Sequence, residues 1–535
     1  MVNLTRNKHI LVATLLAVCL TLLVLGCGGS AGPDSLVAQD QVYTIADATG
    51  DYGFPSPFAH YSRGPGYIRM SMIFDTLLWK DADGYVPALA AKWDYLASEN
   101  AYLFHLNNTA TWHDGKKVTV DDVLFTFDYL KKFPYQTTNI SMIKTVEAID
   151  SSTVKITLSH PHAPFLDQVA GTIPILPRHI WQNITNPAQF RQPEALIGSG
   201  PFKLVDYNKE QGSYLYEAYE GYYQGNPKFK QLKFIKMNVE MATAALKQHQ
   251  IDITQIPPEL VKPLEQTGLK ILTMPHDWIA KLVINHQQEP FNSTEFRQAL
   301  AYAIDRKALI DTTLRGQALP GNPGLIPPDS QWYNPALAEM YLYSPDSAGK
   351  LLAKLGYNKS GSYWEKNGQP LEIELLVTAK AGIPGSPGER QGEFIKVQLE
   401  QFGIKVNLKA LEGKTLDNRI NEGEFELALN GHGGLGADPD FLTNMIVGKG
   451  FNSAHYHQNQ TLTTLLAKQA SLMDNAARKQ LFAEIQTVFA ADVPALALYY
   501  PTWYYAYSNR ANLYFTKQGI GSGAPIPLNK MSFVK

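Results

Sequence analysis

The chain has 535 residues, of which 45% are hydrophobic and 18% are charged, and its formal net charge is −2. This length and composition exclude a disordered chain and allow two or three domains with large cores. The nearly balanced charge also argues against a nucleic-acid-binding surface, which would carry an excess of basic residues.

The N-terminus has the pattern of an export signal. Arg6 and Lys8 precede an apolar run from 10 to 25, which is too short for a comfortable membrane span. The segment V-L-G-C that ends at Cys27 resembles a bacterial lipobox, in which the signal is cleaved before the cysteine and the cysteine is then acylated. We expect residues 27–41 to be a flexible tether behind that lipid anchor. An uncleaved anchor helix is the alternative.

The chain has two cysteines, Cys19 in the signal and Cys27 at its end. The mature chain therefore forms no internal disulfide and has neither a thiolate nucleophile nor a cysteine-based metal site. We expect an exported protein of this kind to rely on the size of its hydrophobic core.

Beyond residue 41, predicted strands and helices are interspersed. Apolar or alternating patterns predict strands at 41–45, 102–107, 229–238, 251–254, 371–378, 404–408 and 425–430, and two strands within 144–158. Helical spacing predicts helices at 67–79, 120–130, 241–248, 344–356 and 392–402, and over most of 459–491. The strand–helix–strand order between 371 and 408 is typical of an α/β fold.

The segment 285–316 predicts two short packed helices. Asn292 or Ser293 caps the first helix, and Asp305 caps the second. Gly316 is a plausible stop for the second helix. One face of the first helix is apolar, with Phe296, Ala299, Leu300, Ala303 and Ile304. This segment predicts a scaffold without visible chemistry.

The same segment resembles the hallmark of the extracellular solute-binding proteins of family 5, the receptors of ABC importers for peptides, nickel chelates and some oligosaccharides. The matching residues are Asn285, Pro290, Phe291, Arg297, Gln298, Ala299, Leu300, Ala303, Ile304, Asp305 and Arg306. Further segments resemble the family in its order, at 85–93, 110–123, 175–180, 198–207, 217–223, 251–254 and 477–500. At Gln250 the chain departs from the family, which usually has glycine there.

The resemblance implies an α/β, periplasmic-binding-protein-like fold of type II, with two lobes joined by a hinge, in the three-domain variant of the peptide receptors. The expected division is a signal peptide (1–26), a lipid-anchored tether (27–41), lobe I (42–72, 199–282 and 499–535), domain II (73–198) and lobe II (283–498).

The resemblance also implies a function. We expect a substrate-binding lipoprotein that captures di- or oligopeptides in the cleft between its lobes and delivers them to an ABC permease and its ATPase. It would be a monomer held outside the cytoplasmic membrane by lipid on Cys27, with no cofactor and no nucleic acid. The alternative is a receptor for nickel or another metal chelate, and a remote one is a hydrolase or sensor on this scaffold.

Catalytic motifs are missing from the sequence. Beyond residue 41 it contains no H-E-x-x-H, no G-x-S-x-G and no G-x-x-x-x-G-K-[ST] pattern, and Gly413-Lys-Thr lacks the upstream glycine of a phosphate loop. The His113-Asp114 pair has no accompanying nucleophile and favours a turn. We therefore expect a protein that is not an enzyme.

The loop 430–440 is the expected ligand site. In peptide-binding members of the family, the preceding strand ends in Gly-Trp, and an aspartate three residues before Asp-Pro holds the ligand's amino group. Here His432 occupies the tryptophan position and Leu435 the aspartate position, while Asp438 keeps its place before a proline. The predicted ligand contacts are His432, Gly433, Gly434, Leu435, Asp438 and Asp440, with Trp278, Tyr61 and Trp332 as aromatic walls.

The loss of that aspartate makes the nickel-chelate alternative stronger. His455 and His457 would place two imidazoles on one face of an extended segment, and His432 would join them as a third metal ligand. The competing interpretation is that all three histidines are loop residues or satisfied hydrogen-bond donors. Asp438 or Asp440 would then be left to supply the lost negative charge.

Overall fold

The computed structural model describes residues 38–62, 64–136, 138–379, 386–436, 438–446, 459–521 and 523–534, without the side chains of 39 and 444–446. The chain divides into two compact units, 1–42 and 43–535, and the second unit carries the fold described below. Over the described ranges, no helix combines the length and the apolar character that a membrane span requires. The predicted signal and Cys27 lie outside the described residues.

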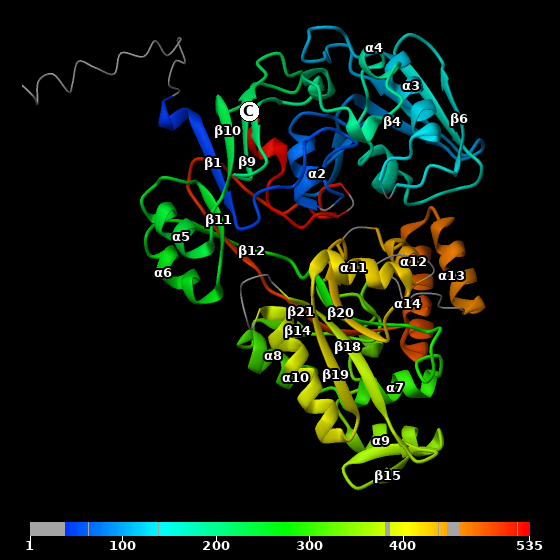
Figure 1. The fold of residues 1–535 in the computed structure, drawn as a ribbon. Coiled ribbons are helices and arrows are strands. Elements are labelled where there is room, and N and C mark those ends of the chain that lie inside the picture. The colour runs from blue at the N-terminus through cyan, green and yellow to red at the C-terminus, as the bar shows by residue number, and fades with distance from the viewer. Residues whose placement is uncertain are drawn as a thin grey trace, which may run out of the picture. The chain divides into compact units, whose positions relative to one another are not determined.

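A seven-stranded sheet in the order β12-β22-β11-β1-β10-β9-β8 forms the first part of the fold (Figure 1). Its strands are β1 (Val42–Asp47), β8 (Phe202–Asn208), β9 (Ser213–Ala218), β10 (Gln231–Lys236), β11 (Ile253–Ile256), β12 (Lys270–Thr273) and β22 (Tyr504–Tyr507). Figure 1 shows α5 (Val239–Lys247) and α6 (Val261–Glu265) beside β11 and β12. Buried aromatic residues such as Tyr43, Tyr216 and Phe234 fill the core of this sheet, together with α2 (Gly64–Ser71).

An antiparallel four-stranded sheet in the order β4-β5-β7-β6 follows α2 in the chain. Its strands are β4 (Ala90–Leu96), β5 (Ala101–Leu106), β6 (Ile143–Ala148) and β7 (Thr153–Leu158), preceded by the hairpin β2 (Leu78–Asp81) and β3 (Gly84–Pro87). The helix α3 (Val120–Lys132) packs on this sheet, and α4 (Arg178–Trp181) contacts α3. Thr119 and Asp122 form a capping box at the start of α3, which is the helix predicted at 120–130.

A mixed six-stranded sheet in the order β14-β21-β13-β20-β18-β19 forms the third part. Its strands are β13 (Ile279–Ile284), β14 (Ala318–Pro320), β18 (Glu372–Ala379), β19 (Lys405–Glu412), β20 (Leu427–His432) and β21 (Ala495–Pro501). Helices surround it: α7 (Thr294–Ala303), α8 (Arg306–Leu314), α9 (Pro345–Lys354), α10 (Pro387–Phe402), α11 (Gly413–Glu422), α12 (Phe441–Ile446), α13 (Gln460–Ala470) and α14 (Asn475–Asp492). Because apolar clusters cover both faces of β13, all six of its residues are buried.

We call the seven-stranded sheet with the attached four-stranded sheet the first lobe, and the six-stranded sheet with its helices the second lobe. The predicted lobe boundaries after 282 and 498 fall inside β13 and β21, so these limits cut across two strands. A small hairpin sheet of β15 (Asn358–Ser360), β16 (Tyr363–Lys366) and β17 (Gln369–Pro370) was not predicted.

The predicted helix 67–79 is wrong beyond Ser71. Residues 72–77 instead exchange backbone hydrogen bonds with distant segments: Phe202 N donates to Met72 O at 3.0 Å and Ile175 N to Asp75 O at 3.0 Å. Leu78 then begins β2. These long-range pairings override the helical spacing of the apolar residues, which propensity alone cannot anticipate.

The two helices predicted in 285–316 are present. Ser293 caps α7 by accepting the N–H of Phe296 at 3.4 Å, and Asp305 caps α8 by accepting the N–H of Ala308 at 2.9 Å. The helix α8 ends at Arg315, whose φ of 54° is left-handed, one residue before the predicted stop. The caps explain why this stretch is helical, and they agree with the scaffold role predicted for it.

Two adjacent segments connect the lobes. Residues 274–278 join β12 to β13, and residues 502–503 join β21 to β22. The segments are bonded to each other, because Met274 N donates to Trp503 O at 2.8 Å and Trp278 packs on Trp503 with ring centroids 5.4 Å apart. Two short neighbouring connections of this kind form a hinge about which lobes can rotate.

Candidate functional site

The glycine-rich loop after β20 lies where the two lobes meet. A Cβ on Gly431 would sit 2.6 Å from Nε1 of Trp278, on the hinge segment. A Cβ on Gly433 would sit 3.1 Å from Cδ of Pro525, which follows Ala524 in the core of the first lobe. Glycine therefore lets the backbone of this loop approach both the hinge and the opposite lobe.

His432 is the last residue of β20 and is buried, with 7% of its surface exposed. Its Nδ1 lies 2.9 Å from the carbonyl oxygen of Gly433, so Nδ1 must carry the proton that is donated. Its Nε2 is buried and has no hydrogen-bond partner among the described residues. Burial, and then the charge of Lys281, lower the pKa of His432 well below its usual value. The imidazole is therefore neutral, with the lone pair of Nε2 available.

Lys281 lies on the same face of the sheet as His432. In the register of β13 and β20, Lys281 pairs with Asn430 and Ile279 pairs with His432. The Lys281 side chain is fully buried, and burial lowers its pKa well below the usual value. The end of β20 therefore places the imidazole of His432 near the amine of Lys281, on a face that also carries Asn430.

The two predicted carboxylates are occupied by the protein's own donors. Both oxygens of Asp438 accept from the guanidinium of Arg478, at 2.5 and 2.6 Å. Asp440 accepts from the side-chain amides of Gln168 at 3.0 Å and Gln469 at 2.7 Å. No local pattern in the sequence indicates these partners, since Gln168 and Arg478 are distant from the loop in the chain.

The other residues predicted to contact the ligand lie in different surroundings. Leu435 and Trp332 are packed in one apolar cluster, 1% and 8% exposed, so we leave them out of the ligand contacts that we propose. Gly434 has a φ of 95°, a conformation that favours glycine. Tyr61 is 46% exposed and donates a hydrogen bond to Asp51 at 3.0 Å. His455 and His457 lie outside the described residues.

Asp277 is a site residue that the sequence analysis missed. It lies on the hinge segment, is 7% exposed, and accepts the backbone N–H of Gly436 in the glycine-rich loop. A Cβ on Gly436 would sit 2.3 Å from Oδ1 of Asp277, so only glycine allows this contact. Burial, and then the charge of Asp329, raise the pKa of Asp277 to about 7. Asp277 thus links the loop to the hinge and titrates near neutral pH.

This pKa predicts a pH dependence of stability. Folded Asp277 holds its proton up to about pH 7, whereas an unfolded aspartate releases it near pH 3.9. The folded state binds more protons between these values, so this contribution is complete below the unfolded pKa and is lost as the pH rises through the folded pKa. We expect Asp277 to account for a loss of about 2–3 kcal/mol at most between pH 5 and pH 8.

Denaturant unfolding of the wild type and of Asp277→Asn from pH 5 to pH 8 measures this contribution. The neutral asparagine should give a flatter profile than the wild type across that range. Parallel profiles for the two proteins would mean that Asp277 does not titrate in this window.

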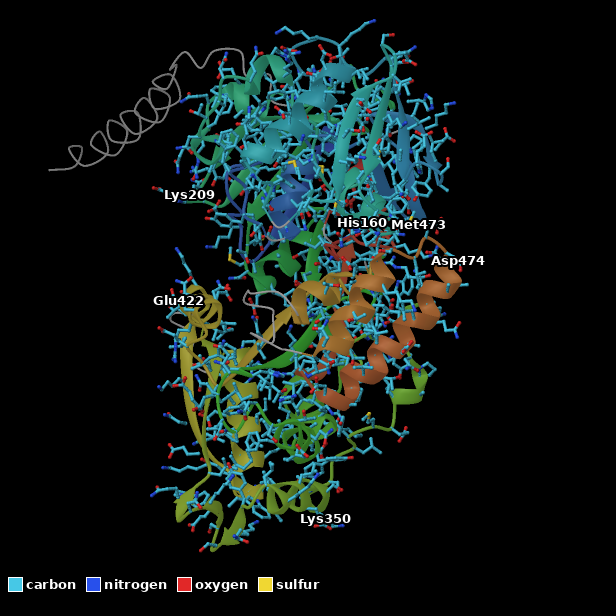
Figure 2. All side chains as sticks on the ribbon, turned by 90° about the vertical axis from the view of Figure 1, so that its right-hand side faces the viewer. His160, Lys209, Lys350, Glu422, Met473 and Asp474 are labelled. Carbon is cyan, nitrogen blue, oxygen red and sulfur yellow. The ribbon has the colours of Figure 1, made fainter. Side chains whose placement is uncertain are left out.

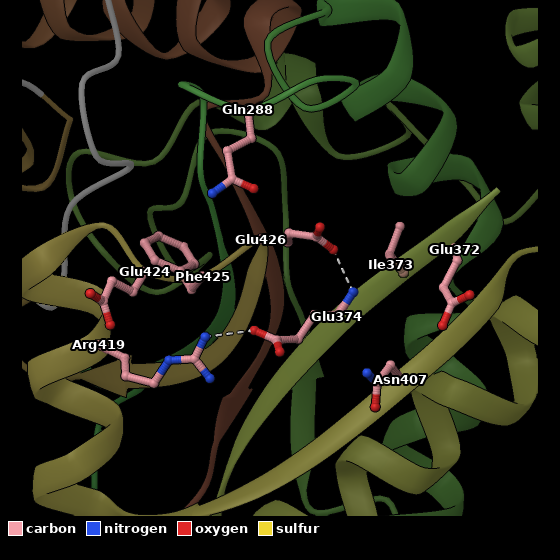
Figure 3. A pocket seen from close by; sticks show the side chains of 9 residues that line it. All are labelled: Gln288, Glu372, Ile373, Glu374, Asn407, Arg419, Glu424, Phe425 and Glu426. Atoms are coloured by element: carbon pink, nitrogen blue, oxygen red, sulfur yellow. Dashed lines mark hydrogen bonds and ion pairs between the residues drawn. The ribbon is translucent and has the colours of Figure 1, made fainter.

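A cavity of about 430 Å³ lies elsewhere in the second lobe, at the edge of β18 and β20 (Figure 3). It shares no residue with the glycine-rich loop, and its acidic lining is partly paired. Glu374 accepts from Arg419 at 2.9 Å, and Glu426 accepts the backbone N–H of Glu374 at 2.5 Å. Among the described residues, no group of three or more histidine, cysteine or acidic side chains is arranged to hold a metal ion.

Comparisons with known proteins cover nearly the whole described fold. A family model described as "Bacterial extracellular solute-binding proteins, family 5 Middle" matches residues 84–454. Heme-binding protein A of Haemophilus influenzae is 26% identical over 537 residues, which cover 90% of this chain and 92% of that protein. The dipeptide-binding protein of Escherichia coli is 25% identical over 448 residues, which cover 78% and 81%.

Among solved structures, NikZ from Campylobacter jejuni in complex with Ni(L-His) has a TM-score of 0.78 at 25% identity. The match covers 93% of this chain and 100% of that chain, so it includes both lobes and the segments that connect them. The fold is therefore that of periplasmic binding proteins, as the resemblance implied.

Proposed function

Because the chain belongs to the bacterial extracellular solute-binding proteins of family 5, we propose that it captures short peptides between its lobes and delivers them to an ABC permease. One observation carries this proposal: the glycine-rich loop lies against both the hinge at Trp278 and the opposite lobe at Pro525. A ligand that contacts this loop and the first lobe would favour the closed state, because only contacts to both lobes shift that equilibrium.

Peptides suit such a site for a physical reason. An extended peptide binds through its main-chain hydrogen bonds, which a glycine-rich backbone without side chains can approach closely. Micromolar affinity needs a net free energy of about −8 kcal/mol, which burial in a closed cleft can supply. The dipeptide-binding relative from Escherichia coli supports this ligand class. His432, Gly433, Gly434 and Trp278 are the contacts that we propose.

The remaining parts of the proposal concern the whole chain. We infer that the signal is removed, that Cys27 carries the lipid anchor, and that the protein is a monomer outside the cytoplasmic membrane. We also infer that the bound solute is released unchanged, since the sequence has no recognisable catalytic motif. Closure would then present a new surface to the permease.

A receptor for a metal chelate is the second candidate, and His432 favours it. Its Nδ1–H is held by the Gly433 carbonyl, while Nε2 is buried and meets no partner in the part of the chain that the structure describes. In histidines that bind metals, the N–H of the ring nitrogen that does not bind the metal usually donates a hydrogen bond to such an oxygen, which fixes the tautomer. The solved relative that contains Ni(L-His) supports this ligand class. The ligand would be the chelate itself, as cargo.

Thermal shifts with two kinds of ligand separate the candidates. We expect a library of di- to hexapeptides to raise Tm, with a stabilisation of about 2.7 kcal/mol when the ligand is at 100 times its Kd. A shift with Ni²⁺ and L-histidine alone, lost in His432→Ala and kept in His105→Ala, would replace the first candidate by the second. The control His105 lies in β5 of the four-stranded sheet. No shift with peptides, nickel chelate or heme would contradict both.

A further inference from the structure

Direct hydrogen bonds join the lobes at a place away from the hinge. The backbone N–H of Ala163, in the segment after β7, donates to the carbonyl of Ala470 at the end of α13, at 2.7 Å. Close by, Nε2 of Gln168 donates to Oδ2 of Asp440 at 3.0 Å. Ala163 and Gln168 belong to the first lobe, and Asp440 and Ala470 to the second. Figure 2 labels His160 and Met473 at this junction.

Asp440 is held firmly on its own side of the junction. Its Oδ1 accepts from Gln469 at 2.7 Å and from Thr443 Oγ1 at 3.0 Å, which leaves Oδ2 for Gln168. Gln469 is in turn fixed by Arg478, whose Nε and Nη2 donate to Oε1 of Gln469 at 2.9 and 2.8 Å. The acceptor that faces the other lobe is therefore positioned before the lobes meet, which lowers the entropy cost of the contact.

Two further carboxylates at the junction form ion pairs within their own lobe. Asp167, next to Gln168, is buried and forms an ion pair with Lys80 at 2.8 Å. Asp438, next to Asp440 in the loop, forms an ion pair with Arg478 at 2.5 Å. Asp167 and Asp438 each have a cation of their own, whereas the charge of Asp440 is stabilised by amide and hydroxyl donors.

We infer that Gln168 and Asp440 form a latch that holds the lobes together before any solute is bound. The latch deepens the proposed function, on which it rests. A protein that is partly closed without ligand binds every ligand more tightly by the same factor, because the apparent Kd depends on the fraction in the competent state. Gln168 and Asp440 are then positioning residues. They raise the affinity for every ligand by the same factor and leave the selectivity between ligands unchanged.

The variant Gln168→Glu tests the latch by placing a carboxylate against Asp440. We expect like-charge repulsion to open the unliganded protein and to raise Kd for dialanine and tetraalanine by about tenfold each, with their ratio unchanged. Adding Asp440→Asn to Gln168→Glu restores a donor opposite the new carboxylate and should recover most of the loss. Gln182→Glu, at an exposed position of the first lobe, is the matched control.

Opening is measured without ligand, so that the latch is tested even if neither peptide binds. Spin labels on Lys209→Cys and Glu422→Cys report the distance between lobes, since these exposed residues lie on one side of the molecule in different lobes (Figure 2). Cys19 and Cys27 are replaced by serine, which leaves these as the only thiols. Gln168→Glu should lengthen the distance, and the added Asp440→Asn should shorten it again. An unchanged distance in Gln168→Glu, or an affinity loss confined to one peptide, overturns the latch.

Discussion

Replacing Arg297 with alanine is expected to lower the free energy of unfolding by about 3–5 kcal/mol, because it leaves the largely buried carboxylate of Asp492 without its cation. Arg297 is 2% exposed and forms an ion pair with Asp492 at 2.6 Å. Its guanidinium also donates to the carbonyls of Phe291 at 2.9 Å and Val493 at 3.1 Å. The side chain thus ties the start of α7 to the end of α14.

Denaturant unfolding monitored by circular dichroism measures the loss, and Arg315→Ala is the control. Arg315 ends α8 and pairs with Glu259 at 3.1 Å, but it is exposed, so its removal should change stability by no more than about 1 kcal/mol. Equal losses in Arg297→Ala and Arg315→Ala would mean that the buried network contributes nothing particular to stability.

Replacing Gly433 with leucine is expected to weaken the binding of every ligand by about 100-fold, which corresponds to about 2.8 kcal/mol. A single added Cβ would already sit 3.1 Å from Pro525 on the opposite lobe and 3.5 Å from Trp278. The rest of the leucine side chain therefore acts as a wedge between the lobes and favours the open state. Because the wedge acts on closure, the loss should be the same for peptides of different sequence.

Isothermal titration with two peptides measures this loss, and Gly413→Leu is the matched control. A Cβ on Gly413, at the start of α11, would have its nearest neighbour at 3.8 Å, which is an ordinary contact. Unchanged affinity in Gly433→Leu would show that the loop does not meet the first lobe in the bound state. A loss for one peptide only would show that the leucine obstructs that peptide directly and does not act on closure.

Local signals made part of the fold predictable from the sequence. The caps Ser293 and Asp305 and the apolar spacing between them define α7 and α8 without any knowledge of distant residues. The same holds for the capping box at Thr119 and for the alternation of β18, α10 and β19. Such elements depend on interactions within a few residues along the chain.

The order of the strands in the sheets could not be predicted from the sequence. The strand β13 lies between β20 and β21, which come much later in the chain. Because apolar residues cover both faces of β13, its pattern specifies neither its register nor its neighbours. The helix predicted over 67–79 was wrong beyond Ser71 for a related reason, since residues 72–77 pair with distant backbone.

In the candidate site too, some features could be predicted from the sequence and others could not. The position of the ligand loop followed from the family resemblance at Asp438 and the strand before it. The partners of Asp438 and Asp440 did not, because Arg478 and Gln168 reach them only in the folded chain. Asp277 carries no local signal at all, since its pKa of about 7 results from burial in the folded chain and from the nearby charge of Asp329.

The claim on which this account depends is that a solute closes the two lobes about the segments 274–278 and 502–503. Small-angle X-ray scattering tests it most directly, on protein stripped of ligand by unfolding and refolding and then supplied with the solute that the native protein carries. The account predicts that the radius of gyration falls when that solute is bound. Scattering that stays the same while calorimetry shows saturated binding would contradict it.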